Sequence, residues 1–282
     1  MSPRPCRRGL FPEPAFPMLS YQHGYHAGNR ADVLKHAILH EIFGRLAEDD
    51  RKILYVETHS GRGRYDLQGA QAKKGNEAGP GVLSMLNGAA PKPLRAWVDF
   101  IETCGVNAYP GSPAHAQTLL PKPTRYVLFE RHPQEYEALV KAIGTDDRVQ
   151  IRKADGYAGA LKLAPRSGET LVGLVDPSYE TSRDIDALAL WTPKALKRWP
   201  KAVLILWLPL FRDGRESEFG EYLTTLGNCK VYGARWPVDA LKETALEGSA
   251  MVVFNGPPAA DKACAAIASS LQSWWSDKPL GD

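Results

Sequence analysis

Residues 29–63 read NRADVLKHAILHEIFGRLAEDDRKILYVETHSGRG. The first part of this stretch carries apolar residues at helical spacing behind an Asn/Asp start signal, and it predicts an amphipathic helix. The second part contains the apolar run Ile53–Glu57, which is typical of a buried strand and leads into a turn with two glycines. The stretch therefore shows the alternation of helix and strand on which an α/β fold is built.

Six further runs of strand type follow along the chain: Tyr126–Glu130, Val149–Ala154, Leu171–Asp176, Ala202–Leu208, Lys230–Trp236 and Ala250–Asn255. Helical stretches separate most of them, which predicts a sheet that is mainly parallel. Only Pro237–Ser249 separates the last two runs, which is too short for a helical crossover, so we expect the final strand to be antiparallel. The predicted fold is a doubly wound, Rossmann-like α/β sheet of seven strands, with one antiparallel strand near its edge.

The chain departs from this regular pattern in two places. The 66 residues between Thr58 and Arg125 are several times what one crossover helix needs. We therefore expect a small helical insertion at about residues 66–115, standing over the carboxyl edge of the sheet. Residues 1–17, MSPRPCRRGLFPEPAFP, are rich in proline and arginine and contain no apolar signal region. We expect them to be a disordered extension of a single domain that spans residues 18–282.

The composition limits the kinds of protein that this chain can be. Of its 282 residues, 44% are hydrophobic and 24% are charged, and no apolar run approaches the roughly 18 residues that a membrane span requires. The net charge is only +3, so a nucleic acid would have to be bound by a local patch. The four cysteines form no C-x-x-C pair, which argues against a zinc module and fits a reducing cytoplasm. We expect a monomeric, cytoplasmic protein without a membrane segment or a metal.

Polar residues follow the first three strands at the edge where open α/β sheets bind their ligands. The first strand leads into the G-x-G turn at Gly61, the second ends in Glu130, and the third ends in Asp155-Gly156. Glu130 is placed to accept both hydroxyl groups of a ribose, and Asp155 to accept a hydrogen bond from an adenine amino group. Each feature alone also fits a tight turn, a solvated charge or a helix N-cap. Together they indicate a cofactor that contains adenosine.

The fourth strand ends in DPSYE, residues 176–180, which carries the most specific signal. An amino group on a flat base needs two hydrogen-bond acceptors for its two N–H groups and a stacking surface for its ring. Asp176, the carbonyl group of Pro177 and the ring of Tyr179 supply these three elements. The alternative interpretation is a β-turn followed by a core tyrosine.

Histidines near the N-terminus allow a different chemistry. His36 and His40 stand four residues apart on the predicted helix, a spacing that can chelate a metal, but no H-E-x-x-H motif follows. We therefore favour a site without a metal. His23 and His26 lie in the segment YQHGYHAGN, whose aromatic, imidazole and small side chains suit contact with a stacked base.

Several strings of the sequence are similar to those of a known family: Tyr21–Asn29, Ala31–His36, Thr58–Tyr65, Tyr109–Pro113 and Asp176–Glu180. From Met18 to about Pro258 the chain resembles the bacterial 23S ribosomal RNA adenine-N6 methyltransferases of the J type. The resemblance implies a class I methyltransferase fold with a helical insertion. It also implies S-adenosyl-L-methionine as the cofactor and one adenine of 23S ribosomal RNA as the substrate.

The resemblance further implies roles for individual residues. Asp176 corresponds to the catalytic acid. Cofactor binding is implied for Lys35, His36, His59, Ser112, Glu130, Asp155, Gly156 and Asp176, and substrate binding for Tyr21, Pro177 and Tyr179. The family pattern at the catalytic turn is DPPYE, whereas Ser178 occupies the third position here. Because Pro177 is retained, we expect Ser178 to loosen the turn and to affect the rate more than the chemistry.

Three other functions remain open at this point. The same turn serves DNA adenine methyltransferases, and methylation assays with RNA and with DNA would distinguish the two substrates. A non-catalytic RNA-binding module with a nucleotide pocket is a second alternative, suggested by Ser178. A metal hydrolase built on His36 and His40 is a third, and metal analysis of the purified protein would test it.

Overall fold

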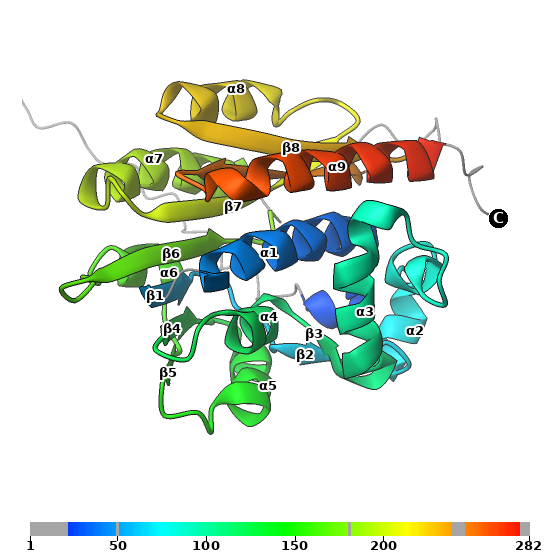
Figure 1. Cartoon of the computed structure of the whole chain (residues 1–282), viewed down its shortest axis with the longest axis horizontal. Coiled ribbons are helices and arrows are strands. Elements are labelled where there is room, and N and C mark those ends of the chain that lie inside the picture. Colours follow the sequence, from blue (N-terminus) through cyan, green and yellow to red (C-terminus); the bar gives the residue numbers. More distant parts are fainter. Residues whose placement is uncertain (1–21, 49–50, 180–181, 239–245, 277–282) are drawn as a thin grey trace, which may run out of the picture.

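The computed structural model describes residues 22–48, 51–179, 182–238 and 246–276. Residues 1–17, for which we expected disorder, lie outside these ranges, and so does Tyr21. Within the described residues, a seven-stranded sheet with helices on both faces forms the centre of the molecule (Figure 1). No helix in these ranges combines the length and the apolar character that crossing a bilayer requires.

All seven predicted strands form, in the spatial order β5-β4-β1-β6-β7-β9-β8. Their bounds are β1 Lys52–Glu57, β4 Arg125–Phe129, β5 Val149–Arg152, β6 Glu169–Val175, β7 Val203–Phe211, β8 Cys229–Arg235 and β9 Leu246–Phe254. Strand β9 runs antiparallel to both of its neighbours, β7 and β8, and the other neighbouring pairs are parallel. The predicted α/β fold with one reversed strand next to the edge is confirmed.

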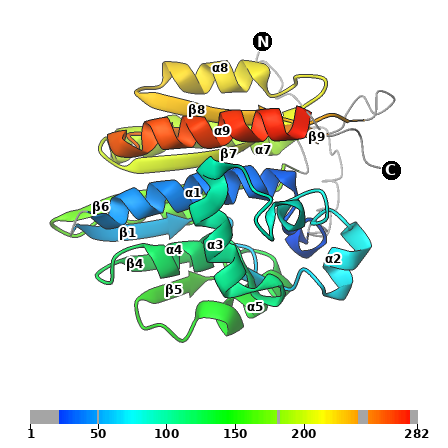
Figure 2. The same ribbon diagram turned by 45° about the vertical axis from the view of Figure 1, so that its right-hand side comes forward.

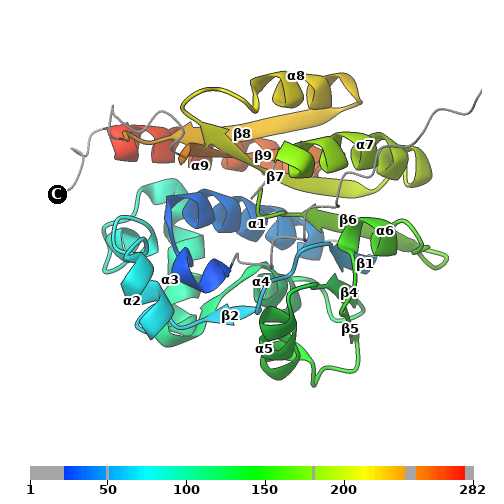
Figure 3. The ribbon, with the colours of Figure 1, turned by 180° about the vertical axis from the view of Figure 1, so that it is seen from behind.

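Helices cover the two faces of the sheet and define two hydrophobic cores. One face carries α1 (Arg30–Glu48), α3 (Arg95–Cys104), α4 (Ser112–Leu119), α5 (Pro133–Ile143) and α9 (Asp261–Ser276). The other face, seen from behind in Figure 3, carries α6 (Gly156–Ala160), α7 (Ser182–Arg198) and α8 (Ser217–Thr225). Strand β1 is buried on both sides, with Tyr55 in the first core and Val56 in the second. A strand buried on both faces has no polar side, which explains its uninterrupted apolar sequence.

The segment between β1 and β4 contains helices α2 (Ala70–Gly75), α3 and α4 and three short 3-10 helices, η2 (Val82–Met85), η3 (Lys92–Leu94) and η4 (Val106–Ala108). Figure 2 shows α3 crossing α1 on the face of the sheet. The stretch that follows α2 instead lies at the carboxyl ends of the strands, where Glu77 and Ser84 line a large cavity. The segment also contains two strands of two residues, β2 (Arg64–Tyr65) and β3 (Tyr109–Pro110), which pair with each other. Strands this short have no periodicity, so the sequence did not predict them.

The chain reverses its direction of winding at β1, because β4 and β5 are added on one side of β1 and β6 on the other. The loop that follows β1 is hydrogen-bonded to both neighbours. The N–H of Thr58 donates to Leu174 of β6 at 3.1 Å, and the N–H of Ser60 donates to Phe129 of β4 at 3.0 Å. The loop is therefore fixed at the switch point of the sheet, where open α/β folds bind ligands.

A fully buried carboxyl group ends strand β1. Glu57 accepts a hydrogen bond from Tyr55 at 3.0 Å and another from the hydroxyl group of Ser112 at the start of α4. Burial raises the pKa of Glu57 from its ordinary value of 4.5 to about 8, although both hydrogen bonds act in the opposite direction. The folded chain therefore keeps a proton on this group near neutral pH.

This protonation predicts a pH dependence of stability. Between about pH 4.5 and 8 the folded state holds a proton on Glu57 that the unfolded state has released, so the contribution of Glu57 to the free energy of unfolding falls as the pH rises. The contribution is at most about 1.4 kcal/mol per pH unit. We expect Glu57→Gln, which stays neutral, to flatten this dependence in urea unfolding measured at pH 5, 6.5 and 8. The control Glu221→Gln, at an exposed site on α8, should keep the wild-type slope. An equally steep slope in Glu57→Gln would contradict the assignment.

Candidate active site

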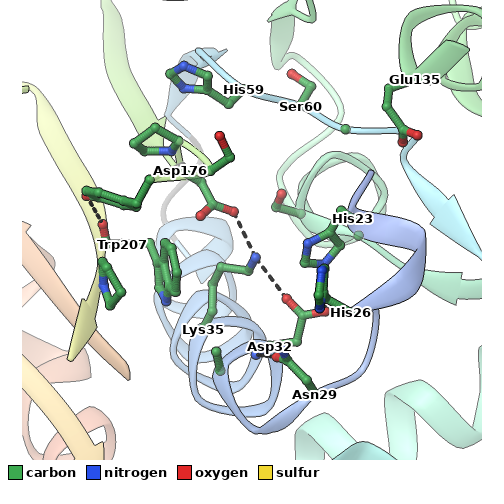
Figure 4. A pocket seen from close by; sticks show the side chains of 18 of the residues that line it. His23, His26, Asn29, Asp32, Lys35, His59, Ser60, Glu135, Asp176 and Trp207 are labelled. Atoms are coloured by element: carbon green, nitrogen blue, oxygen red, sulfur yellow. Dashed lines mark hydrogen bonds and ion pairs between the residues drawn. The ribbon is translucent and has the colours of Figure 1, made fainter. Parts of the chain in front are cut away.

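A cavity of about 1310 Å³ opens at the carboxyl ends of β1, β4, β5 and β6 (Figure 4). Every site residue predicted from the sequence that lies within the described ranges lines it: Lys35, His36, His59, Ser112, Glu130, Asp155, Gly156, Asp176, Pro177 and Tyr179. The structure thus brings together residues from four strand ends and from α1 and α4. The remaining predicted residue, Tyr21, is outside the described part of the chain.

The centre of the cavity contains a buried ion chain formed by Asp176, Lys35 and Asp32. The ammonium group of Lys35 donates to Asp176 Oδ2 at 2.8 Å and lies 2.9 Å from Asp32 Oδ1 (Figure 4). Burial by itself would lower the pKa of Lys35, but the two carboxylates outweigh it and hold that pKa well above its ordinary value. Lys35 therefore stays charged, and Asp176 Oδ1 is left without a hydrogen bond within the described residues.

Asp32 is a residue of this site that the sequence did not predict. Its Oδ2 accepts a hydrogen bond from the N–H of Gly28 at 2.8 Å and lies 2.9 Å from His23 Nε2. Burial would raise the pKa of Asp32, but the charges of His23 and Lys35 keep it well below its ordinary value. In the sequence Asp32 belongs to a helix start signal and to the string Ala31–His36, and nothing local to it indicates that it binds Lys35 and His23.

The turn after β6 presents Tyr179 beside Trp207 of β7. Tyr179 has a φ of 51°, in the left-handed region, and its hydroxyl group donates to the carbonyl oxygen of Trp207 at 2.7 Å. The two rings meet edge to face, with centroids 5.4 Å apart, and the Lys35 ammonium lies 5.9 Å from the Trp207 ring. Trp207 thus places an aromatic ring beside that of Tyr179 in the wall of the cavity. The sequence predicts only a core strand at Trp207, because this residue lies within an apolar run.

The two carboxylates predicted to bind adenosine also hold the backbone in place. Glu130 accepts hydrogen bonds from the N–H groups of Gly61 at 2.8 Å and His132 at 2.7 Å. Burial raises the pKa of Glu130 above its ordinary value. Asp155 caps α6 by accepting a hydrogen bond from the N–H of Ala158 at 2.8 Å, which is the N-cap alternative. A carboxylate has about four lone-pair positions, so both groups keep acceptors for a ligand.

Of the two predicted cofactor histidines, His36 is buried and His59 is half-buried. His36 Nδ1 lies 2.7 Å from the hydroxyl group of Tyr109, and burial holds the pKa of His36 well below its ordinary value. His59 Nδ1 lies 2.8 Å from the hydroxyl group of Thr58, and burial also lowers the pKa of His59. Both rings are therefore neutral at pH 7. Within the described ranges, no three His, Cys, Asp or Glu side chains come together in a geometry that would hold a metal ion.

Comparisons with known proteins agree with this arrangement. The family model described as "Ribosomal RNA large subunit methyltransferase D, RlmJ" matches residues 50–280. Ribosomal RNA large subunit methyltransferase J of Escherichia coli (strain K12) is 36% identical over 247 residues, which cover 85% of this chain and 88% of that protein. The protein of the same name from Haemophilus influenzae is 29% identical over 247 residues, with the same coverage.

A solved structure extends the likeness to the fold. A protein from Legionella pneumophila superimposes with a TM-score of 0.77 at 25% identity, covering 89% of this chain and 94% of that one. The Rossmann-like class I methyltransferase fold implied by the sequence resemblance is confirmed, and so is the resemblance itself. The chain therefore belongs to the ribosomal RNA large subunit methyltransferase D, RlmJ, family.

Proposed function

We propose that this chain is an enzyme that transfers a methyl group from S-adenosyl-L-methionine to N6 of one adenine in 23S ribosomal RNA. The observation that carries the proposal is the position of the Asp176 turn, which opens into the same cavity as Glu130 and Asp155. The carboxylates that would bind adenosine and the turn that would accept hydrogen bonds from an amino group thus line one cavity. The ribosomal RNA named in the relatives' descriptions supports the choice of polymer.

The residues of the cavity fit the proposed cofactor. Glu130 offers acceptors for a ribose, Asp155 offers one for an adenine amino group, and Ser112 brings a hydroxyl group from α4. At Gly156, which lines the cavity, a Cβ atom would lie only 2.0 Å from the carbonyl oxygen of Thr58. Only glycine lets the segment after β5 approach the loop after β1 this closely. When bound, S-adenosyl-L-methionine supplies an electrophilic methyl group on a sulfonium centre.

Asp176 is the residue that we assign to the chemistry. Its Oδ2 is held by Lys35, which leaves Oδ1 to accept one N–H of the target amino group, while the Pro177 carbonyl accepts the other. Two acceptors in these positions draw the nitrogen lone pair out of conjugation with the base and aim it at the methyl donor. The carboxylate then receives the proton that the amine releases. Its contribution is mainly positional and electrostatic, because an aromatic amine is a weak base.

We extend the proposal to the organisation of the chain. The methyltransferase domain would span residues 18–282, with the insertion at about 66–115. We propose that the enzyme acts as a monomer. We place the reaction in the cytoplasm, where ribosomal RNA is made in bacteria. DNA adenine methylation and RNA binding without turnover are the alternatives, and transfer assays with RNA and DNA fragments distinguish all three.

Loss of the Glu130 carboxylate should weaken cofactor binding. Each charge-assisted hydrogen bond to a ribose contributes on the order of 1.5–3 kcal/mol, so Glu130→Ala should raise the dissociation constant at least tenfold. Isothermal titration calorimetry with S-adenosyl-L-methionine measures this change. Glu137→Ala, at an exposed position of α5, is the matched control and should bind like the wild type. Equal affinity in the two variants would refute the ribose assignment.

Loss of Asp176 should separate binding from chemistry. We expect Asp176→Ala to slow methyl transfer by orders of magnitude while the cofactor still binds, because other strand ends hold the ribose and the adenine. Single-turnover transfer to a 23S ribosomal RNA fragment measures the rate. Asp186→Ala removes an exposed carboxylate of α7 and should leave the rate unchanged. Undiminished transfer by Asp176→Ala would overturn the mechanism.

Restoring the family turn should preserve or raise activity. The backbone N–H of Ser178 donates no hydrogen bond within the described residues, so a proline there would break none. Proline would also reduce the freedom of the turn that carries Asp176 and Tyr179. We expect Ser178→Pro to transfer methyl groups at least as fast as the wild type in the single-turnover assay. A large loss of rate would show that this turn needs a backbone conformation that proline cannot adopt.

A further inference from the structure

Asp32 has more polar contacts than a helix start requires. Its side chain is 1% exposed, and its two oxygens together meet the Lys35 ammonium, the Gly28 N–H and His23 Nε2, all within 2.9 Å. Its own backbone N–H donates to Asn29 Oδ1 at 2.9 Å, which fixes the first turn of α1. A carboxylate with partners on both oxygens and an anchored backbone is held in one orientation.

We propose that Asp32 is a positioning residue of the methyl transfer, which acts by holding Lys35 against Asp176. The proposal rests on the function proposed above, in which Asp176 Oδ1 receives the target amine. Lys35 bridges the two carboxylates, at 2.9 Å from Asp32 and 2.8 Å from Asp176, and its side chain is 6% exposed. Asp32 thus determines where the ammonium group lies, and the ammonium group determines which way Asp176 faces.

The flexibility of lysine explains why a second anchor is needed. Its four-carbon stem ends in a point charge that can donate in several directions. With Asp176 as its only partner, the ammonium group would follow that carboxylate through its rotations and would not restrain it. Asp32 lies one turn earlier on the same helix, and the Gly28 N–H holds it from the other side. The anchor therefore belongs to rigid secondary structure, while Asp176 lies in a turn.

The charge balance points to the same role. The charged, titratable and aromatic groups that face Lys35 are Asp32 and His36 of α1, Glu57 of β1, Tyr65 of β2, Asp176 after β6 and the ring of Trp207 of β7, and His23 of η1 (His23–Tyr25) contacts Asp32. Among the residues that the structure describes, only Asp32 and Asp176 have oxygens within 2.9 Å of the ammonium nitrogen. Without Asp32, one carboxylate would have to balance a buried ammonium group, and the pKa of Lys35 would fall.

The test is Asp32→Asn in single-turnover transfer to a 23S ribosomal RNA fragment at saturating S-adenosyl-L-methionine, from pH 6.5 to 9.5. Lys35 and Gly28 meet different oxygens of Asp32, so the one amide oxygen of asparagine can accept from only one of them. We expect the rate at neutral pH to fall by about a hundredfold, the loss typical of a reacting group displaced by about 1 Å. We also expect a high-pH decline that begins at lower pH than in the wild type. Calorimetry with the cofactor sets the concentration that saturates each variant, so the rate reports the transfer step alone.

A double-mutant cycle separates positioning from a merely structural effect. If Asp32 acts through Lys35, then Asp32→Asn should change the rate less than twofold in a Lys35→Gln background. A structural effect would give the same loss in both backgrounds. Glu48→Gln removes an exposed carboxylate from the far end of α1 and should match the wild type throughout. If Asp32→Asn does not fold by circular dichroism, Asp32→Glu takes its place in the cycle, because it keeps the charge and displaces it by one methylene.

The outcomes for the two proposals differ. Wild-type rates in the Asp32 variant, or equal losses in both backgrounds, overturn the positioning role and leave the methyl transfer standing. A wild-type chain that binds the cofactor but transfers no methyl group to any 23S fragment overturns the proposed function, and the positioning role with it. A loss confined to the background that contains Lys35, together with the shifted high-pH decline, supports the role of Asp32.

Discussion

The burial of the Lys35 ammonium group is the constraint on which the centre of this structure depends. A buried charge is tolerated only when opposite charges and hydrogen bonds come with it. Here Asp32 comes from the same helix, and Asp176 comes from the end of β6 on the sheet. The ion chain therefore ties the N-terminal turn of α1 to the switch point of the sheet. The cavity lies where these two parts of the molecule meet.

The sheet supplies the other half of this arrangement. Strand β1 lies between β4 and β6, and the loop that follows it is hydrogen-bonded to both. The acids at the ends of β4, β5 and β6 consequently face one space, although they are far apart in the sequence. Glu130 and Asp155 also hold the backbone that surrounds them, through Gly61 and Ala158. The groups that we assign to the cofactor are thus part of the scaffold, which keeps them rigid before any ligand arrives.

Predictions from the sequence were accurate where the signal was local. Runs of five to seven residues of strand type marked all seven strands, and the short connection from Pro237 to Ser249 predicted the reversal of β9. The polar residues at the strand ends followed from the rule that parallel strands end at one edge. The strands β2 and β3 were missed because two residues carry no period. Trp207 was missed because an aromatic residue in an apolar run looks the same whether it faces a core or a cavity.

The sequence by itself determined the fold class, the strand ends that carry acids and the resemblance to a methyltransferase family, because periodicity and short motifs are properties of neighbouring residues. Only the tertiary structure decided how these residues work together. Lys35 and Asp176 are separated by 141 positions, and no local pattern links a lysine on a helix to an aspartate after a strand. The same holds for Glu57 and Ser112, whose contact joins β1 to α4. Pairing between distant charges depends on how the elements pack, and packing exists only in the folded chain.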